Sequence, residues 1–376
     1  MASFKIPLHR WVKNPIPLYN IVCKLPGGRW AWHQWVSFRA TDFSNLSVMI
    51  RYIIEIDGWS ANLNWLDVSQ VEDFSQLFCE SSFCGDISKW NMSSAKDCSW
   101  MFFKSSFNGD ISQWDVSKVT NMARMFYESD FNQDISGWNT GKVKDMQEMF
   151  LGSRFNQDLS RWDVSSVETM ERMFAYSVFN QSIYHWNVSR VKNFTGMFYQ
   201  SSFNQPLSQW DVSGAQCMSG MFASSKFNQP IGNWCVSSVT EMNSMFAYSE
   251  FSQDISRWDV SSVMMMIAMF QGCTVIQDFS DWPIHRGCRV HQMFEETHFK
   301  GRLSYVNIHE DFQSSVFLNS SIEKEMRSKK DIEPYGLTWN QVVDFMKVEE
   351  KNEHLERCLT HPESHEEESV KVKRRL

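Results

Sequence analysis

Residues 131–138 read Phe131-Asn-Gln-Asp-Ile-Ser-Gly-Trp138, and after a turn the chain continues as Val143-Lys-Asp-Met-Gln-Glu-Met149-Phe150. This unit recurs along most of the chain. Its tryptophans stand 24 residues apart, at Trp90, Trp114, Trp138, Trp162, Trp186, Trp210, Trp234, Trp258 and Trp282. Met-Phe pairs keep the same period and end at Phe102, Phe126, Phe150, Phe174, Phe198, Phe222, Phe246, Phe270 and Phe294. Two residue classes in phase over nine units indicate a repeat array.

Each unit has two halves with different apolar patterns. Val143, Met146, Met149 and Phe150 are spaced for one side of a short helix or helical turn. Serines two residues before the opening apolar residue are expected to cap that helix, and Gly141 is also tolerated at this position. These serines are Ser93, Ser117, Ser165, Ser189, Ser213, Ser237 and Ser261.

The other half, Phe-Asn-Gln-Asp-Ile-Ser, predicts a short strand that pairs in parallel with its copies. Strict alternation would turn Gln133 to the same face as Phe131 and Ile135. Two alternatives remain open: the glutamine amides form a hydrogen-bonded ladder along the stack, or the strand begins after Gln133. In either case one unit exposes most of its apolar face, and stacking buries it. We therefore expect an α/β repeat solenoid, a right-handed stack of about ten 24-residue strand-turn-short-helix coils.

The repeated pattern F-N-Q-D-[IL]-S-x-W-[DN]-V-S-x-V-x-x-M-x-x-M-F resembles the repeat of the BspA-like leucine-rich repeat surface-protein family, the type also found in mycoplasma lipoproteins. The resemblance covers residues 59 to 305. It implies a leucine-rich-repeat-like solenoid and a role in binding or adhesion rather than catalysis. Surface members of that family carry an export signal, whereas the N-terminus here lacks an uninterrupted apolar core. We therefore expect a cytoplasmic or otherwise intracellular protein, with a surface or virion location as the alternative.

Composition excludes several classes of protein. The 376 residues are 43% hydrophobic and 15% aromatic, enough for a large core. The net charge of −8 argues against general nucleic-acid binding, and no apolar run approaches membrane-spanning length. Nine cysteines do not follow the period, which favours free thiols in a reducing compartment over a disulfide framework.

The chain divides around the array. Residues 1–43 form a non-repetitive N-terminal segment, and residues 44–58 are expected to be an N-terminal cap helix because Leu46, Ile50, Ile53 and Ile54 have helical spacing. The repeat solenoid occupies 59–305, followed by a linker and C-terminal cap at 306–336. A capping-box pattern at Thr338-Trp-Asn-Gln341 predicts an amphipathic helix over 337–360. Residues 361–376 read as a charged, disordered tail.

Candidates for chemistry are few. Asp86, Asp110, Asp134 and Asp158 share one repeat position, and a carboxylate row could bind calcium, but a turn-capping row is favoured because glycine-rich loops are absent. The His354, Cys358, His361 and His365 group has zinc-ligand atom types, yet Pro362 and charged flanks argue against a site. No catalytic motif occurs. We predict no catalytic, cofactor-binding or metal-binding residue, and no enzyme.

Surface variation is what remains for function. The residue before each tryptophan varies, and repeat proteins recognise partners through such positions along a concave face. The predicted partner-binding residues are Lys89, Gln113, Arg161, His185, Gln209 and Arg257. The alternative is that these positions are simply exposed and unconstrained. Aromatic residues after Met-Phe form a rival surface: Phe103, Tyr127, Tyr176, Tyr199 and Tyr248.

The sequence thus predicts a non-enzymatic repeat scaffold that binds another protein. Two alternatives stay open. The array could read substrates for an adaptor or enzyme whose activity lies in the terminal segments, or it could be a structural surface or virion component.

Overall fold

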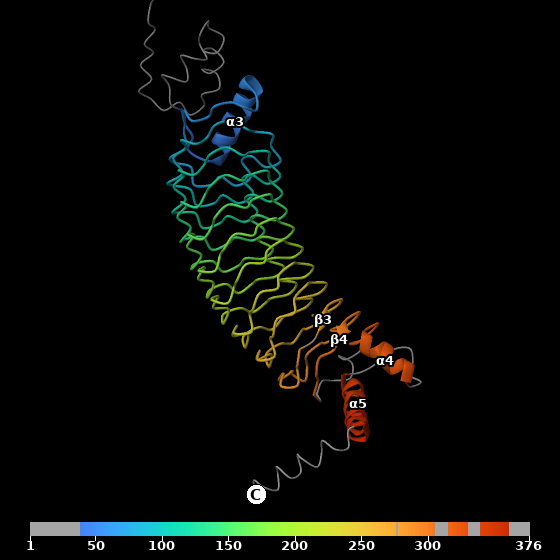
Figure 1. Ribbon diagram of the computed structural model, residues 1–376. Coiled ribbons are helices and arrows are strands. Elements are labelled where there is room, and N and C mark those ends of the chain that lie inside the picture. Colours follow the sequence, from blue (N-terminus) through green and yellow to red (C-terminus); the bar gives the residue numbers. More distant parts are fainter. Residues whose placement is uncertain (1–37, 276, 305–314, 330–338, 361–376) are drawn as a thin grey trace, which may run out of the picture.

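A computed structural model describes residues 38–275, 277–304, 315–329 and 339–360. The chain winds into a stack of coils that bends along its length (Figure 1). Helix α3, Phe43–Asp57, lies at the N-terminal end of the stack. Helices α4, Ser321–Lys329, and α5, Trp339–Thr360, lie at the other end. The helical residues of the described chain are therefore outside the coils.

Successive coils are joined in parallel with a constant register of 24 residues. Bridges link Asp97 to Asn121, Asn121 to Asp145 and Asp145 to Thr169, and the series continues to Arg289. Around each bridge, alternate backbone N–H groups donate to the next coil. The amides of Glu148, Phe150 and Gly152, for example, donate to carbonyls one coil later at 2.7, 3.0 and 2.8 Å. We call this side of the stack the ladder face.

The short helix expected in each unit is absent from the described coils, and this prediction was wrong. Where a helix would bond each amide to the carbonyl four residues earlier, Met149 and Leu151 donate three residues back, to Met146 and Glu148. The intervening amides bond to the next coil instead. This requires a positive φ at two positions of most coils, for example 53° at Glu148 and 64° at Gly152. Hydrogen bonds between coils thus take the place of helical ones. The spacing of Val143, Met146 and Met149 reflects consecutive turns.

The serine caps change accordingly. Six of these seven serines donate their backbone N–H to the Asp or Asn directly after the tryptophan; Ser165 N–H, for example, lies 3.0 Å from Asp163 Oδ1. The exception is Ser237, where Cys235 takes that place. The serine follows an Asx turn and does not begin a helix.

The coils are more widely spaced away from the ladder face. Ring centroids of the Met-Phe phenylalanines repeat every 5.6 to 6.0 Å, whereas tryptophan centroids repeat every 6.2 to 6.5 Å. If successive coils differed only by a translation, every pair of equivalent rings would be equally far apart. The tryptophan rings are farther apart than the phenylalanine rings, so neighbouring coils fan apart toward the tryptophans. We infer that the ladder face lies inside the bend and the tryptophan side outside it.

In the central coils this spacing decides between the two alternatives for Gln133 and its equivalents, a hydrogen-bonded ladder or a shorter strand. Strands pair at about 4.8 Å, and the Phe-Asn-Gln-Asp-Ile-Ser segments there, whose phenylalanine rings repeat at about 6.3 Å, are not bridged. Asparagine side chains span the gap: Asn132 Oδ1 accepts the Asn156 N–H at 2.9 Å and the Gln157 side chain at 3.2 Å. The expected strand is thus replaced by a ladder of asparagine and glutamine side chains, which we call the Asn-Gln ladder. This is the first of the two alternatives, except that the asparagine side chain is the acceptor.

The strands that do form are short and lie at the ends. Strand β1, Phe38–Arg39, pairs with β2, Leu66–Asp67. Strand β3, Thr274–Val275, pairs with β4, His298–Phe299. Both pairs are parallel, as the coil winding requires.

One continuous apolar core runs through the stack. The repeated Phe, Ile or Leu, Trp, Val, Met and Met-Phe side chains are buried along its length. Each indole N–H donates to a carbonyl of the preceding coil, as Trp162 does to Ile135 at 3.0 Å. The tryptophans therefore tie neighbouring coils together as well as filling the interior.

Caps close both ends of the core. Asp42 begins α3, where its side chain accepts the Asn45 N–H at 2.9 Å. At the other end, Ser320 caps the Glu323 N–H while the Glu323 carboxylate accepts the Asn319 N–H. This reciprocal cap begins α4. The segments 1–37, 305–314, 330–338 and 361–376 lie outside the described residues, and so do the tail prediction and most of the N-terminal one.

Candidate partner-binding surface

The six residues predicted to contact a partner form one exposed row on the tryptophan side. Lys89, Gln113, Arg161, His185, Gln209 and Arg257 are all exposed, and each stands a multiple of 24 residues from the next. We call the series of positions before the tryptophans the variable row. Two of its side-chain contacts are local: Gln113 bonds to Ser112 at 3.2 Å, and His185 packs edge-on against Tyr184. Asn233 instead donates to the Ser208 carbonyl of the preceding coil at 2.7 Å. Because coils fan apart here, the row lies on the outer face and not on a concave one.

Acidic residues flank the variable row on both sides. One flank holds the Asp86, Asp110, Asp134 and Asp158 series, and the other holds the Asp or Asn that follows the tryptophan in most coils. These side chains accept the backbone N–H two residues later, as Asp134 does from Ser136 at 2.8 Å. Among the described residues, no His, Cys, Asp and Glu group has the arrangement of a metal site. The aspartates cap turns.

The tryptophan side is strongly negative. From four residues before each tryptophan to one residue after it, between residues 86 and 283, eleven exposed aspartates stand against three basic residues, Lys89, Arg161 and Arg257. The aspartates are Asp86, Asp110, Asp115, Asp134, Asp158, Asp163, Asp211, Asp254, Asp259, Asp278 and Asp281. The outer face therefore attracts cationic partners.

The turn-capping aspartates predict a specific loss of stability in acid. The backbone N–H and hydroxyl of Ser136 lower the pKa of Asp134, and the same groups of Ser256 lower the pKa of Asp254. Since an unfolded aspartate titrates near pH 3.9, the unfolded chain binds protons first. We expect the thermal midpoint to stay level from about pH 7 to 5 and to fall below about pH 4. Calorimetry across this range measures it.

The matched control is the Asp134→Asn and Asp254→Asn double variant. Asparagine keeps the acceptor oxygen, as Asn139 and Asn187 do in their own turns, but does not titrate. The decline in acid should therefore be shallower in this variant. An unchanged decline would contradict a stabilising role for these carboxylates.

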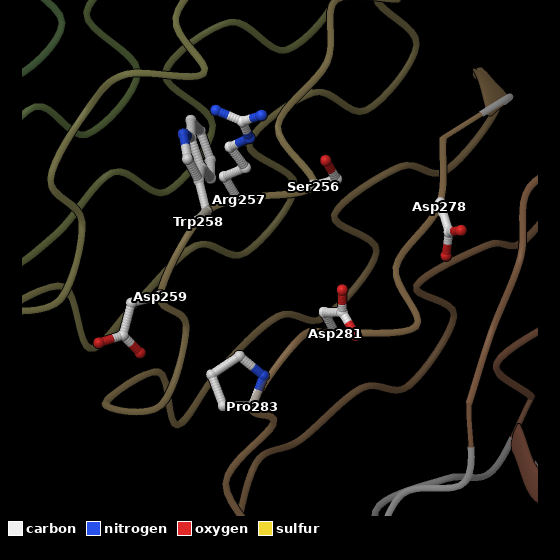
Figure 2. Close-up of a pocket in the computed structure, with 7 residues that line it drawn as sticks. All are labelled: Ser256, Arg257, Trp258, Asp259, Asp278, Asp281 and Pro283. Atoms are coloured by element: carbon white, nitrogen blue, oxygen red, sulfur yellow. The ribbon is translucent and has the colours of Figure 1, made fainter.

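A pocket opens on the same face between two neighbouring coils near the C-terminal end. Its volume is about 550 Å³, and its lining includes Arg257, Asp259, Asp278, Asp281 and Pro283. Figure 2 shows these side chains projecting from the two coils around the opening. Sequence reasoning identified Arg257 but missed the other four. Two of them break the pattern visibly: Asp281 is the only acid of the variable row from 89 to 281, and Pro283 replaces the Asp or Asn after the tryptophan.

The rival aromatic residues lie on the ladder face, in two rows. Phe103, Tyr127 and Tyr199 share one repeat position, while Tyr176 and Tyr248 stand one residue later. The structure brings Phe103 and Tyr127 together at 4.6 Å and Tyr176 and Tyr199 at 5.1 Å. Tyr176 and Tyr248 are about half exposed. The aromatic surface is thus broken into separate pairs.

An ion-paired series beside them was also missed by sequence reasoning. Glu148, buried, accepts from Arg124 at 2.7 Å and lies 3.7 Å from Arg172 in the following coil. Arg124 in turn covers the Trp100 ring at 4.6 Å. The signal was available, because these residues share one repeat position. Their charges are already paired within the chain, so this series stabilises the stack.

The remaining candidates are cysteines and the histidines near the C-terminus. Seven cysteines among the described residues are free thiols, and burial raises the pKa of Cys98, which leaves it protonated and unreactive. Burial likewise raises the pKa of Cys288 to about 12. The side chains of His354 and Cys358, together with residues 361 and 365, lie outside the description.

A family model described as "Mycoplasma protein of unknown function, DUF285" matches the chain three times in tandem, over residues 44–154, 129–226 and 201–306. The matches together span α3 and nearly all of the coils, which is more than half of the chain. The chain belongs to this family. The tandem matches identify a repeat protein. No curated protein and no solved structure matches the chain. Within the described residues, no helix combines the length and the apolar character needed to cross a bilayer.

Proposed function

We propose that this chain is a non-enzymatic repeat scaffold that binds another protein through the variable row on its outer face. We further propose that its coils form a right-handed solenoid related to leucine-rich repeat proteins of the BspA-like type, without their helical segments. One observation carries the proposal. The variable row is a continuous exposed line whose side chains change from coil to coil, while in most coils an aspartate or asparagine on either side accepts a turn hydrogen bond.

The fixed frame explains why most of the positions around the variable row keep their residue type. Tryptophan indoles, turn aspartates and the Asn-Gln ladder all make inter-coil or turn hydrogen bonds, so their identities are constrained. The variable row makes no comparable inter-coil side-chain bond in most coils. Many weak contacts added over several coils can then give affinity and specificity without changing the scaffold.

The proposal is tested by blocking the row without disturbing the fold. Gly137 belongs to the row, and a Cβ added there would meet no atom within 4 Å. A Gly137→Trp and Gln209→Trp variant should therefore fold normally but lose at least tenfold in recovery of a specific partner from the source-cell lysate, measured by quantitative mass spectrometry.

The matched control places the same bulk elsewhere. Ser106 and Ser202 are exposed and share another repeat position, so Ser106→Trp with Ser202→Trp should leave recovery unchanged. Equal recovery by wild type and the row variant, with equal thermal midpoints, would contradict binding through the variable row.

A further inference from the structure

The pocket near Arg257 coincides with a break in the coil pattern. In most other coils an Asp or Asn after the tryptophan accepts a hydrogen bond from the N–H two residues later, as Asp259 does from Ser261 at 3.0 Å. Pro283 has no such oxygen, and this coil instead turns through the Ile284 N–H, which donates to the Trp282 carbonyl at 2.9 Å. The chain therefore departs from the regular path where the pocket of about 550 Å³ opens. That volume lies within the range of ligand sites, roughly 300–1,000 Å³.

The chemistry of the lining selects the charge of an occupant. The lining holds three carboxylates, Asp259, Asp278 and Asp281, and one guanidinium, Arg257, so it carries a net negative charge. Asp259 Oδ1 accepts the Ser261 N–H at 3.0 Å, and Asp278 Oδ1 accepts the Ser280 N–H at 2.9 Å. These two hydrogen bonds do not use the second oxygen of either carboxylate. The hydroxyls and backbone N–H groups of Ser261 and Ser280 also lower the pKa of Asp259 and Asp278, so both are ionised at neutral pH.

One basic residue of the following coil acts on these carboxylates from a distance: the charge of Arg302 helps to lower the pKa of Asp278. Among the described residues, no basic side chain forms an ion pair with Asp259, Asp278 or Asp281 within 4.0 Å, and Arg257 is no exception. The acids also do not converge as metal ligands would. An extended organic cation, which can reach carboxylates on both coils, fits this arrangement better than a bare ion.

We propose that this pocket receives a cationic side chain, lysine or arginine, of the protein partner. The proposal rests on the proposed function, because the pocket lies at the end of the variable row and includes Arg257. The negative outer face steers a basic partner toward the scaffold, and the pocket fixes its register along the coils. Arg257 at the pocket adds a requirement for an acidic or neutral residue beside the inserted cation.

The test uses the full chain labelled with ¹⁵N-tryptophan, because Trp258 lines the pocket. The probes are three acetylated pentapeptides, Gly-Ser-X-Ser-Gly amides in which X is arginine, lysine or norleucine. We expect a saturable shift of the Trp258 indole resonance with the arginine and lysine peptides and none with norleucine. In the Asp278→Asn and Asp281→Asn double variant the Kd should rise at least fivefold.

The control variant removes the same charge from the same face, at Asp134→Asn and Asp158→Asn, and should leave the Kd unchanged. Equal weakening in both variants would overturn the proposal, since general attraction by the acidic face would then explain binding. Absence of a saturable shift with either cationic peptide would overturn it as well. Neither result bears on the Gly137→Trp and Gln209→Trp experiment, so a failed pocket is distinguishable from a failed scaffold.

Discussion

Replacing Trp162 with alanine is expected to lower the free energy of unfolding by about 3–5 kcal/mol. Trp162 is 3% exposed, and its ring stacks on Trp138 at 6.3 Å and packs against Phe150 at 6.2 Å. Truncation leaves a cavity in the continuous core. It also removes the indole donor from the Ile135 carbonyl, which lies buried between two coils. Both effects act at the centre of the stack, where each coil depends on its neighbours.

Urea denaturation followed by tryptophan fluorescence and circular dichroism measures this loss. Trp59→Ala is the matched control, because Trp59 is 51% exposed and the substitution removes the same atoms. Its effect should stay within about 0.5 kcal/mol, as for most surface changes. If the two variants lost equal stability, the tryptophan row would not be the feature that holds the coils together.

Several structural features follow from the period of 24 alone. It gives the register of every bridge along the ladder face, because Asp97, Asn121 and Asp145 occupy one repeat position. It also separates inside from outside: Phe131, Ile135, Val143 and their equivalents are buried, while the variable row is exposed. Repetition makes such predictions strong, since a feature supported in one coil is tested again in the next.

The local conformation of each coil does not follow so simply. Val143, Met146 and Met149 have helical spacing, yet inter-coil hydrogen bonds determine the backbone there. Those bonds join residues 23 apart and are invisible in the pattern of a single unit. A warning was nevertheless present: Gly152 and Gly272 share one repeat position and Gly196 and Gly220 another, and all four have positive φ. Gly196 and Gly220 stand inside the expected helix, where recurrent glycine indicates a turn.

The candidate site shows the same division. The variable row could be read from the sequence because it is defined by position in the repeat. The pocket could not, because it depends on how one coil departs from its neighbours. Only its chemical exceptions, Asp281 and Pro283, were visible beforehand. Helix α4 was missed for another reason: its signal, Ser320 followed three residues later by Glu323, lies in a segment assigned to linker and cap.

The Asn-Gln ladder leads to the second large expected effect. Asn156→Ala should lower the free energy of unfolding by about 1–2 kcal/mol, because it leaves a partly buried backbone donor without its partner. Asn156 Oδ1 accepts the Asn180 N–H at 2.9 Å and the Gln181 side chain at 3.3 Å. With the coils spaced at about 6.3 Å on this side, no backbone carbonyl of the neighbouring coil replaces that acceptor in the regular register.

Two controls separate this hydrogen bond from loss of bulk. Gln157→Ala removes a side-chain donor while Asn132 Oδ1 keeps the Asn156 N–H, so a cost of only about 0.5–1 kcal/mol is expected. Asn156→Asp keeps the acceptor oxygen and should retain most of the stability that alanine loses. Amide hydrogen exchange at Asn180 provides the direct measurement, with faster exchange expected in Asn156→Ala and little change in Gln157→Ala. Should Asn180 stay equally protected in Asn156→Ala, the asparagines would not be what joins the coils on their outer side, and the fan-like spacing would need another support.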